Sequence, residues 1–308
     1  MARTKKATLE RVYEPGLEVP RVPEGAPTVG AVLEGGGFRG MYTSGVIDVW
    51  MENGVTATAT VGVSAGATFG CNFKSLQVGR AFRYNMRFCA DPRYAGLRNL
   101  IFTGDLFGRE FAYGELPWKY DVFDTGAFQA NPMRFTVVAT DAATGEAVYH
   151  DLDTGGPEDV EWIRASASIP GVSRPVRLEG RELLDGGTAD AIPFEWMLAQ
   201  GYDRCVVVLT QDAAYRKEPN GLMPLLRVVL RRYPALIELL ENRHERYNRQ
   251  RERLCELERA GKVFVVRPSE PVRLPSVVRD PELLRRVYEV GRRDAEKSLD
   301  ALRGYLSR

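Results

Sequence analysis

The chain has 308 residues, 44% of them hydrophobic, and its 42 Lys and Arg residues nearly balance 41 Asp and Glu residues, for a net charge of +1. Such a composition is typical of a globular protein with a sizeable core and excludes general disorder. The small net charge gives no reason to expect a nucleic-acid partner, so charge-driven binding must be local.

The cysteines and histidines argue against a metal cluster or a disulfide framework. There are four cysteines without C-x-x-C spacing and only two histidines, a pattern that favours a reduced, cytosolic protein. No apolar run has signal-peptide character at the start, and none reaches about 18 residues later in the chain. We expect a cytoplasmic protein, and peripheral contact with the inner membrane surface stays open.

The first elements form an alternating pattern. Residues 1–27 are rich in Pro, Glu and basic residues without periodicity, which predicts an N-terminal arm. Next, "TVGAVLE" (28–34) predicts a buried strand, 38–53 a helix and "TATATVGV" (56–63) a second strand. Strand, helix and strand with short connections predict two parallel strands joined by a right-handed crossover.

Further strands are predicted at "MRFTVVATD" (133–141), "AVYHDL" (147–152) and "RCVVVLTQ" (204–211). The connection "DAATGE" suits a hairpin between the first two, so the sheet should be mixed. We therefore expect an α/β fold: a three-layer sandwich around a mostly parallel, mixed central sheet.

Three segments differ from this alternation. Residues 94–128 hold many aromatics without clean periodicity, which favours short helices and loops folded over the sheet. Residues 222–262 are helical in pattern and carry 10 Lys and Arg against 6 Glu. After the strand-like "KVFVVRP", a charged helix is predicted from about residue 281. We expect a catalytic domain at 28–275 and a C-terminal helical extension, packed on it, at 276–308.

The stretch "EGGGFRG" raises the question of nucleotide binding, because Gly35, Gly37 and Gly40 fit the dinucleotide pattern G-x-G-x-x-G. That fold places an acidic residue about 20 positions later to bind ribose, yet residues 53–90 contain no Asp or Glu. The better interpretation is an oxyanion hole, in which the amides of Gly35, Gly36 and Gly37 converge on a developing negative charge. Arg39 adds positive potential there.

A candidate nucleophile follows the second predicted strand. In "GVSAGA", Gly62, Ser64 and Gly66 satisfy G-x-S-x-G, the turn that holds a serine between a strand and a helix. An ordinary tight turn would use the same small residues. Both glycine motifs, however, lie at the carboxyl ends of consecutive parallel strands, the edge where α/β folds bind ligands.

The serine needs a base, and neither histidine is favoured. His244 falls in a charged helical pattern, and His150 follows a strand near a turn. Asp185 in "LLDGG" ends an apolar run before Gly186 and Gly187, which makes a Ser-Asp pair plausible. A plain Asp-Gly turn is the alternative.

The motifs "GGGFRG", "GVSAG" and "DGG", in this order and with the block "ASASIPGV" (165–172), resemble the patatin-like phospholipase family. The resemblance covers about 28–209, and "FVVRPSEP" is similar to bacterial members. It implies a lipid acyl hydrolase that uses a Ser-Asp dyad, Ser64 and Asp185, without histidine, metal or other cofactor. The third motif ends in Gly187, where family members vary between Gly and Ala.

The resemblance implies a phospholipid or another acyl-ester lipid as substrate, without calcium dependence. A soluble esterase, a thioesterase, an acyltransferase and a non-catalytic lipid-binding module remain alternatives. The aromatic residues Phe102, Phe107, Phe111 and Trp118 either line an acyl channel or, as the default, pack in the core. Arg227, Arg231 and Arg232 among apolar residues either rest on an anionic membrane or form the solvated face of a packed helix.

Overall fold

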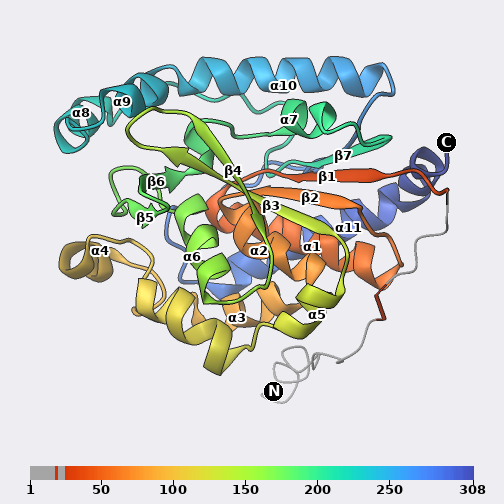
Figure 1. Ribbon diagram of the computed structural model, residues 1–308, viewed down its shortest axis with the longest axis horizontal. Coiled ribbons are helices and arrows are strands. Elements are labelled where there is room, and N and C mark those ends of the chain that lie inside the picture. Colours follow the sequence, from red (N-terminus) through yellow and green to blue (C-terminus); the bar gives the residue numbers. More distant parts are fainter. Residues whose placement is uncertain (1–17, 20–24) are drawn as a thin grey trace.

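A mixed eight-stranded sheet separates two layers of helices in the computed structural model, which describes residues 18–19 and 25–308 (Figure 1). Strands β8, β7, β1, β2 and β3 are neighbours in this order, and every pairing among them is parallel. The predicted α/β fold with a mostly parallel, mixed sheet is therefore confirmed. Most of the predicted arm at 1–27 lies outside the described residues.

The predicted crossover unit is present at the centre of the sheet. Strand β1 (Val29–Leu33) leads through the short 3-10 helix η1 (Gly37–Arg39) and α1 (Gly40–Glu52) to β2 (Ala59–Val63). The pairing of β1 with β2 is parallel. On the other side of β1 lie β7 (Arg204–Val208) and β8 (Phe264–Val266), two strands whose existence the sequence predicted without their place in the sheet.

Beside β2 the sheet becomes mixed. Strands β3 (Arg134–Asp141) and β4 (Ala147–Leu152) form the predicted antiparallel hairpin. A second hairpin, β5 (Val176–Leu178) and β6 (Arg181–Asp185), was not predicted, and β6 pairs antiparallel with the end of β3.

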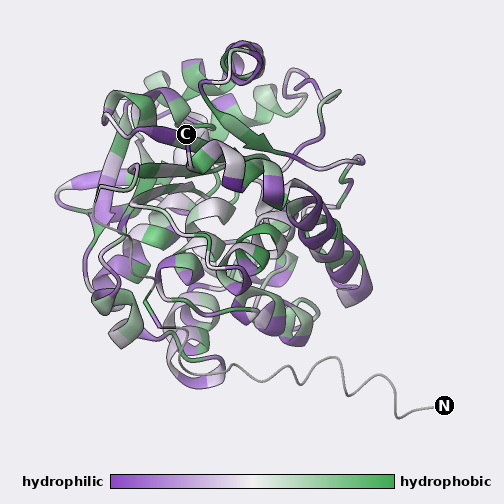
Figure 2. Ribbon diagram, turned by 90° about the vertical axis from the view of Figure 1, so that its right-hand side faces the viewer, coloured by the Kyte–Doolittle hydropathy of each residue, from purple (hydrophilic) through white to green (hydrophobic). Residues whose placement is uncertain are grey.

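Helices cover both faces of the sheet (Figure 1). The helices packed on the face with α1 are α2 (Ala65–Lys74), α3 (Arg80–Phe88), α6 (Pro157–Ser166) and α11 (Pro281–Leu306). The opposite face carries α7 (Phe194–Ala199) and α10 (Arg243–Arg259). Central strands are largely hydrophobic in Figure 2, whereas hydrophilic residues colour the outer helices.

Two segments differ in detail from their prediction. The aromatic-rich segment contains α4 (Leu97–Thr103), α5 (Thr125–Ala130) and, in place of short helices alone, the 11-residue π-type helix η2 (Glu110–Tyr120). The basic segment is divided into α8 (Met223–Val229), α9 (Pro234–Glu241) and α10, and Pro224 and Pro234 lie in the first turns of α8 and α9. No helix of the described residues has the length and apolar character needed to cross a membrane.

The long C-terminal helix α11 packs directly on α1. Tyr288 on α11 donates a hydrogen bond of 2.7 Å to the buried Asp48 carboxylate on α1. Gly45 and Gly291 let the two backbones approach, because a Cβ on Gly45 would lie 2.3 Å from the Tyr288 carbonyl oxygen. Whether 276–308 is a separate extension from a domain at 28–275 stays a prediction.

Candidate active site

The register of β3 brings Ser64 and Asp185 together. Residues 135–140 of β3 pair with β4 on one edge, so β2 and β6 share the other edge. The last partner pair of β2 is Val63 with Val138, and the next residue of β3, Ala139, pairs with Asp185. Strand β6 thus takes the place of β2 where β2 ends, and Asp185 lies directly beyond the turn that carries Ser64.

The backbone at Ser64 has the unusual conformation of a sharp strand-to-helix turn. Ser64 immediately precedes α2, has a φ of 54° and a ψ of −114°, and is 8% exposed. Gly66 must be glycine here, because a Cβ would lie 2.1 Å from the Leu33 carbonyl oxygen. The Ser166 hydroxyl accepts a 2.9 Å hydrogen bond from the Ser64 amide. The predicted junction between strand and helix is thereby confirmed, with the helix N-terminus beneath the serine.

Asp185 is buried and faces the serine. The Ser64 hydroxyl is positioned to donate a hydrogen bond to the carboxylate, and the Gly187 amide donates a second at 2.8 Å. Burial is the largest influence and raises the pKa of Asp185, while Ser64, Arg243 and the Gly187 amide act against this rise. A carboxylate with a raised pKa is a better proton acceptor near neutral pH.

The glycine loop, residues 35–37, lies against the turn that carries Ser64. Gly37 has a φ of +56°, and a Cβ on Gly35 would lie 3.0 Å from the Ser64 Cβ. Among the described residues, the amides of Gly36 and Gly37 have no hydrogen-bond acceptor. These two donors beside the hydroxyl suit an incoming oxyanion. Close packing also surrounds the remaining motif glycines, namely Gly40, Gly62 and Gly186.

A buried glutamate before this loop connects it to α10, which the sequence had not suggested. Glu34 accepts hydrogen bonds from Tyr247 Oη at 2.5 Å and from the Thr210 amide at 2.6 Å. Arg243, at the start of α10, donates through Nε to the Gly187 carbonyl at 2.7 Å. Helix α10, which the sequence predicted as a charged helix face, therefore also holds the glycine loop and the Asp-Gly-Gly turn.

Residues of the segment 165–172 hydrogen-bond to the backbone on both sides of the site. The Ser166 hydroxyl donates a 2.6 Å hydrogen bond to the Val138 carbonyl, besides accepting from Ser64. The Ser168 carbonyl accepts a 2.8 Å hydrogen bond from the Asp185 amide. One short segment thus orients both halves of the Ser-Asp pair.

Two cavities meet at Ser64. The first is mainly apolar and is lined by residues of α2, α3, η2 and α6; its lining includes Ser64, Phe69, Phe107, Ala112, Leu116 and Ile163. Of the four aromatics for which an acyl channel was the alternative to core packing, Phe107 lines this cavity, Phe111 is buried in the core, Trp118 is half-buried and Phe102 is exposed. The second cavity is more polar, and its lining includes Glu34, Asp185, Gly187, Lys217 and Arg243.

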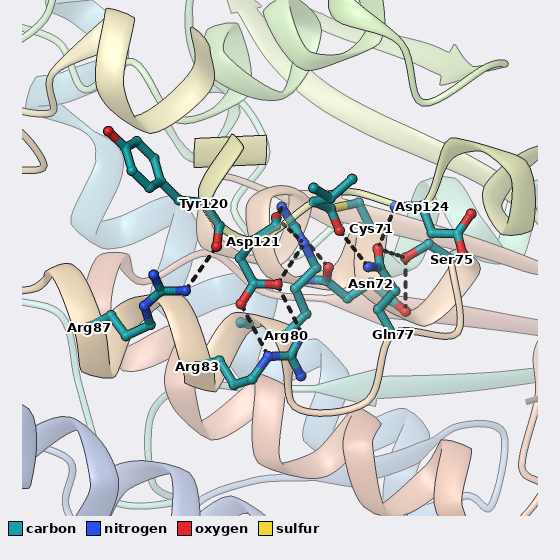
Figure 3. Close-up of polar contacts among 12 residues, drawn as sticks. Cys71, Asn72, Ser75, Gln77, Arg80, Arg83, Arg87, Tyr120, Asp121 and Asp124 are labelled. Carbon is teal, nitrogen blue, oxygen red and sulfur yellow. Dashed lines mark hydrogen bonds and ion pairs between the residues drawn. The ribbon is translucent and has the colours of Figure 1, made fainter. Parts of the chain in front are cut away.

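One residue in the lining of the apolar cavity is a hydrogen-bonded arginine. Arg80 lines this cavity and is itself buried. It donates to the Asp121 carbonyl through Nε and Nη2 and to Asn72 Oδ1 through Nη1 (Figure 3). Because these bonds fix the guanidinium, Arg80 forms a firm wall.

The histidines are not part of either cavity lining. His244 contacts the Glu241 carbonyl within the helical segment, and His150 lies on β4, stacked on Trp162 with ring centroids 3.8 Å apart. Within the described part of the chain, no three His, Cys, Asp or Glu side chains gather as a metal site would require.

The fold and the site define an α/β protein with a serine at a strand-to-helix turn facing a buried aspartate. A sequence model of the patatin-like phospholipase family matches residues 31–198. The chain belongs to this family, as its motifs indicated. A second model, described as a domain of unknown function (DUF6363), matches residues 233–307, which include α10.

Similar curated proteins include an uncharacterised NTE family protein of Mycobacterium tuberculosis, 30% identical over 218 residues, covering 70% of this chain and 59% of the relative. The uncharacterised protein YjjU of Escherichia coli is 28% identical over 280 residues, covering 86% and 75%. Lysophospholipase nte1 of Aspergillus niger is 29% identical over 181 residues, covering 57% and 11%. The chain thus spans less than two thirds of the mycobacterial relative.

Solved structures with low sequence identity are also similar. Human GIVD cytosolic phospholipase A2, in complex with methyl γ-linolenyl fluorophosphonate, has a TM-score of 0.48 and 11% identity, covering 91% of this chain and 58% of that one. VipD from Legionella pneumophila has a TM-score of 0.45 and 13% identity, covering 90% and 67%.

Proposed function

We propose that the protein is a lipid acyl hydrolase of the phospholipase A or lysophospholipase type, with Ser64 as nucleophile and Asp185 as general base. The observation that carries this proposal is the buried Ser64–Asp185 contact at the junction of an apolar and a polar cavity. A long acyl chain and a polar leaving group need such a pair of environments.

In the proposed reaction, Asp185 accepts the Ser64 proton while Oγ attacks the ester carbonyl. The amides of Gly36 and Gly37 stabilise the oxyanion of the tetrahedral intermediate, with Gly35 and Arg39 completing the loop. Asp185 returns the proton to the departing alcohol, leaving an acyl-enzyme. A water that gives its proton to the same carboxylate then releases the fatty acid, and the proton returns to Ser64.

The central experiment measures fatty acid release from a lysophospholipid by wild type, Ser64→Ala and Asp185→Asn. Both variants should lose at least about 1000-fold in kcat, the scale seen when a nucleophile or its base is removed. Ser298→Ala, on the distant helix α11, is the matched serine control. Wild-type hydrolysis by folded Ser64→Ala would overturn the proposal.

Hydrolysis of other acyl esters or thioesters, and transfer of the acyl group to an alcohol, would use the same catalytic residues. Turnover of phospholipid, lysophospholipid, triacylglycerol and acyl-CoA by the wild type separates a phospholipase from an esterase or a thioesterase. Transfer to an added alcohol identifies an acyltransferase. A fluorophosphonate that labels the wild type and not Ser64→Ala excludes a non-catalytic lipid-binding module.

Contact with a membrane surface is part of the proposal. Helices α4 and α8 both lie beyond the same end of the sheet (Figure 1). Large apolar side chains on them are exposed: Leu97, Ile101 and Phe102 on α4, and Leu225, Val228 and Val229 on α8. The adjoining residues Leu222 and Leu226 line the polar cavity. Exposed Arg98, Arg231 and Arg232 accompany these apolar groups, a combination that suits an anionic lipid surface such as the inner membrane face.

A further inference from the structure

Three cationic side chains converge on the polar cavity beside Ser64. Arg39 comes from η1, Lys217 from the loop after β7, and Arg243 from the start of α10, and all three line the cavity that contains Ser64 and Asp185. Each is only partly accessible to solvent. Parts of the chain far apart in sequence therefore concentrate positive charge at this one place.

None of these cations has a carboxylate within ion-pair distance among residues 18–19 and 25–308. Within the described part of the chain, the Arg39 Nε is buried without a hydrogen-bond partner, and Lys217 Nζ lies over the Tyr247 ring, 4.9 Å from its centroid. Arg243 uses Nε on the Gly187 carbonyl, which leaves its two Nη groups for another acceptor.

The two carboxylates that line the same cavity, Glu34 and Asp185, favour the charged form of Lys217 but lie outside ion-pair distance of the three cations. Glu34 already accepts from Tyr247 and Thr210, and Asp185 from the Gly187 amide. Burial lowers the pKa of Lys217 to about 8, and the positive charge of Arg243 contributes to this decrease. Partly buried cations that repel one another cost free energy, which an anion between them would recover.

The position of the cluster indicates which part of a substrate it would meet. Ser64, Phe107 and Ile169 line both cavities, so the ester carbonyl lies where the two join. An acyl chain in the apolar cavity leaves the alcohol side of the ester in the polar cavity. The group that meets Lys217 and Arg243 is therefore on the leaving alcohol.

We propose that Lys217 and Arg243 form a subsite for an anionic phosphate on the leaving alcohol, and so select glycerophospholipid esters over neutral acylglycerols. This inference rests on the proposed function. Arg243 offers the two parallel Nη donors that suit phosphate, and Lys217 supplies a point charge. Because Arg243 lies within residues 233–307, the C-terminal region takes part in substrate choice.

The test compares two substrates with the same medium-length acyl chain, both below their aggregation concentrations. One is a lysophosphatidylglycerol, whose phosphodiester is anionic, and the other is the neutral monoacylglycerol. In Lys217→Met and Arg243→Gln, the ratio of kcat/KM for the anionic over the neutral substrate should fall roughly 10- to 100-fold, the range for a hydrogen bond to a charged group. Arg243→Lys should restore part of the ratio. Lys297→Met on α11, which is exposed, is the matched control.

An unchanged ratio in both variants would overturn the subsite. Competition experiments separate two sources of phosphate: glycerophosphoglycerol should inhibit wild type more strongly than Lys217→Met. If inorganic phosphate inhibited and glycerophosphoglycerol did not, with the ratio of kcat/KM for the two substrates unchanged in the variants, the cations would bind free anions. That result would contradict a lipid phosphate as their ligand. Monoacylglycerol turnover that survives Ser64→Ala would instead contradict the proposed function, so the two failures are distinguishable.

Discussion

The Ser166 hydroxyl accepts a hydrogen bond from the backbone amide of Ser64 at 2.9 Å. The same hydroxyl donates to the Val138 carbonyl on β3 at 2.6 Å. Ser64 has a φ of 54°, a conformation that costs on the order of 1–3 kcal/mol in a residue other than glycine. Ser166 therefore fixes the position of the strained Ser64 turn relative to strand β3.

We expect Ser166→Ala to lower kcat about tenfold or more with little change in KM. The buried Ser64 amide would lose its acceptor, at a cost of about 1–3 kcal/mol, and the turn could relax away from Asp185. The rate of labelling by a fluorophosphonate should fall in parallel, because it reports the position of the hydroxyl.

Ser168→Ala is the matched control for this prediction. Its hydroxyl donates to the Arg164 carbonyl, and its contact with Asp185 is made by the backbone, which the substitution leaves in place. Equal kcat for folded Ser166→Ala and wild type would show that the serine bridge does not position the nucleophile.

The local parts of the site could be predicted from the sequence. The glycine loop and the Ser64 turn follow strands whose apolar runs are unambiguous, and the short-range backbone geometry requires small residues there. The β5–β6 hairpin was missed because its turn uses Glu179 and Gly180 at φ values of 49° and 74°. Asn or Asp is the usual residue at the first of these positions, so the local signal was weak.

The long-range parts of the site left no local signal. Tyr247 contacts Glu34 across 213 positions of sequence, and Arg243 reaches the Gly187 carbonyl across 56. In the sequence, α10 is a run of charged residues with few apolar ones, typical of a solvated helix. Only the tertiary packing distinguishes its buried residues, such as Tyr247 and Arg251, from its exposed ones.

The pKa of Asp185 leads to a prediction about activity and pH. Burial raises this pKa above the ordinary value near 3.9. A base must be deprotonated to act, so kcat/KM for a neutral ester should fall as the pH falls through the raised value. Arg243 favours the ionised form, and Arg243→Gln should therefore move this acid limb to higher pH.

The measurement is a pH–rate profile between pH 4 and 9 with a soluble neutral ester, for wild type and Arg243→Gln. Arg249→Gln, an exposed change one to two turns later on α10, controls for a general loss of positive charge. A limb that stays in place in Arg243→Gln, or moves to lower pH, would contradict the assignment of Asp185 as the base.

The apolar cavity predicts how acyl length can be altered. Ala112 on η2 lines this cavity, whose wall at Arg80 is fixed by hydrogen bonds. A larger side chain at position 112 would occupy space that a long acyl chain needs. Ala112→Phe should lower kcat/KM for a palmitoyl ester about tenfold or more relative to a butyryl ester.

Ala112→Ser keeps the volume nearly unchanged and serves as the control for this substitution. Both variants are compared with wild type on p-nitrophenyl esters of increasing chain length, together with their thermal unfolding. A length profile of Ala112→Phe that coincides with that of wild type would place the acyl chain elsewhere.

The exposed apolar side chains of α4 and α8 predict binding to anionic vesicles. Leu225 and Val228 are 59% and 62% exposed, and burying that exposed part in lipid would contribute about 1–2 kcal/mol for each residue. The double substitution Leu225→Glu and Val228→Glu removes this gain and adds negative charge. Co-sedimentation with vesicles of phosphatidylglycerol and phosphatidylcholine should weaken at least about tenfold, while turnover of a soluble ester persists.

Val122→Glu provides a control of the same chemistry, because Val122 is 60% exposed between η2 and α5 and lies outside both cavity linings. It should bind vesicles as wild type does. Vesicles of phosphatidylcholine alone test the charge: weaker wild-type binding to them is expected, since Arg98, Arg231 and Arg232 would then lose their anionic partners. If the α8 double variant binds as tightly as Val122→Glu, α8 does not contact the membrane, and the protein must reach its lipid through another surface.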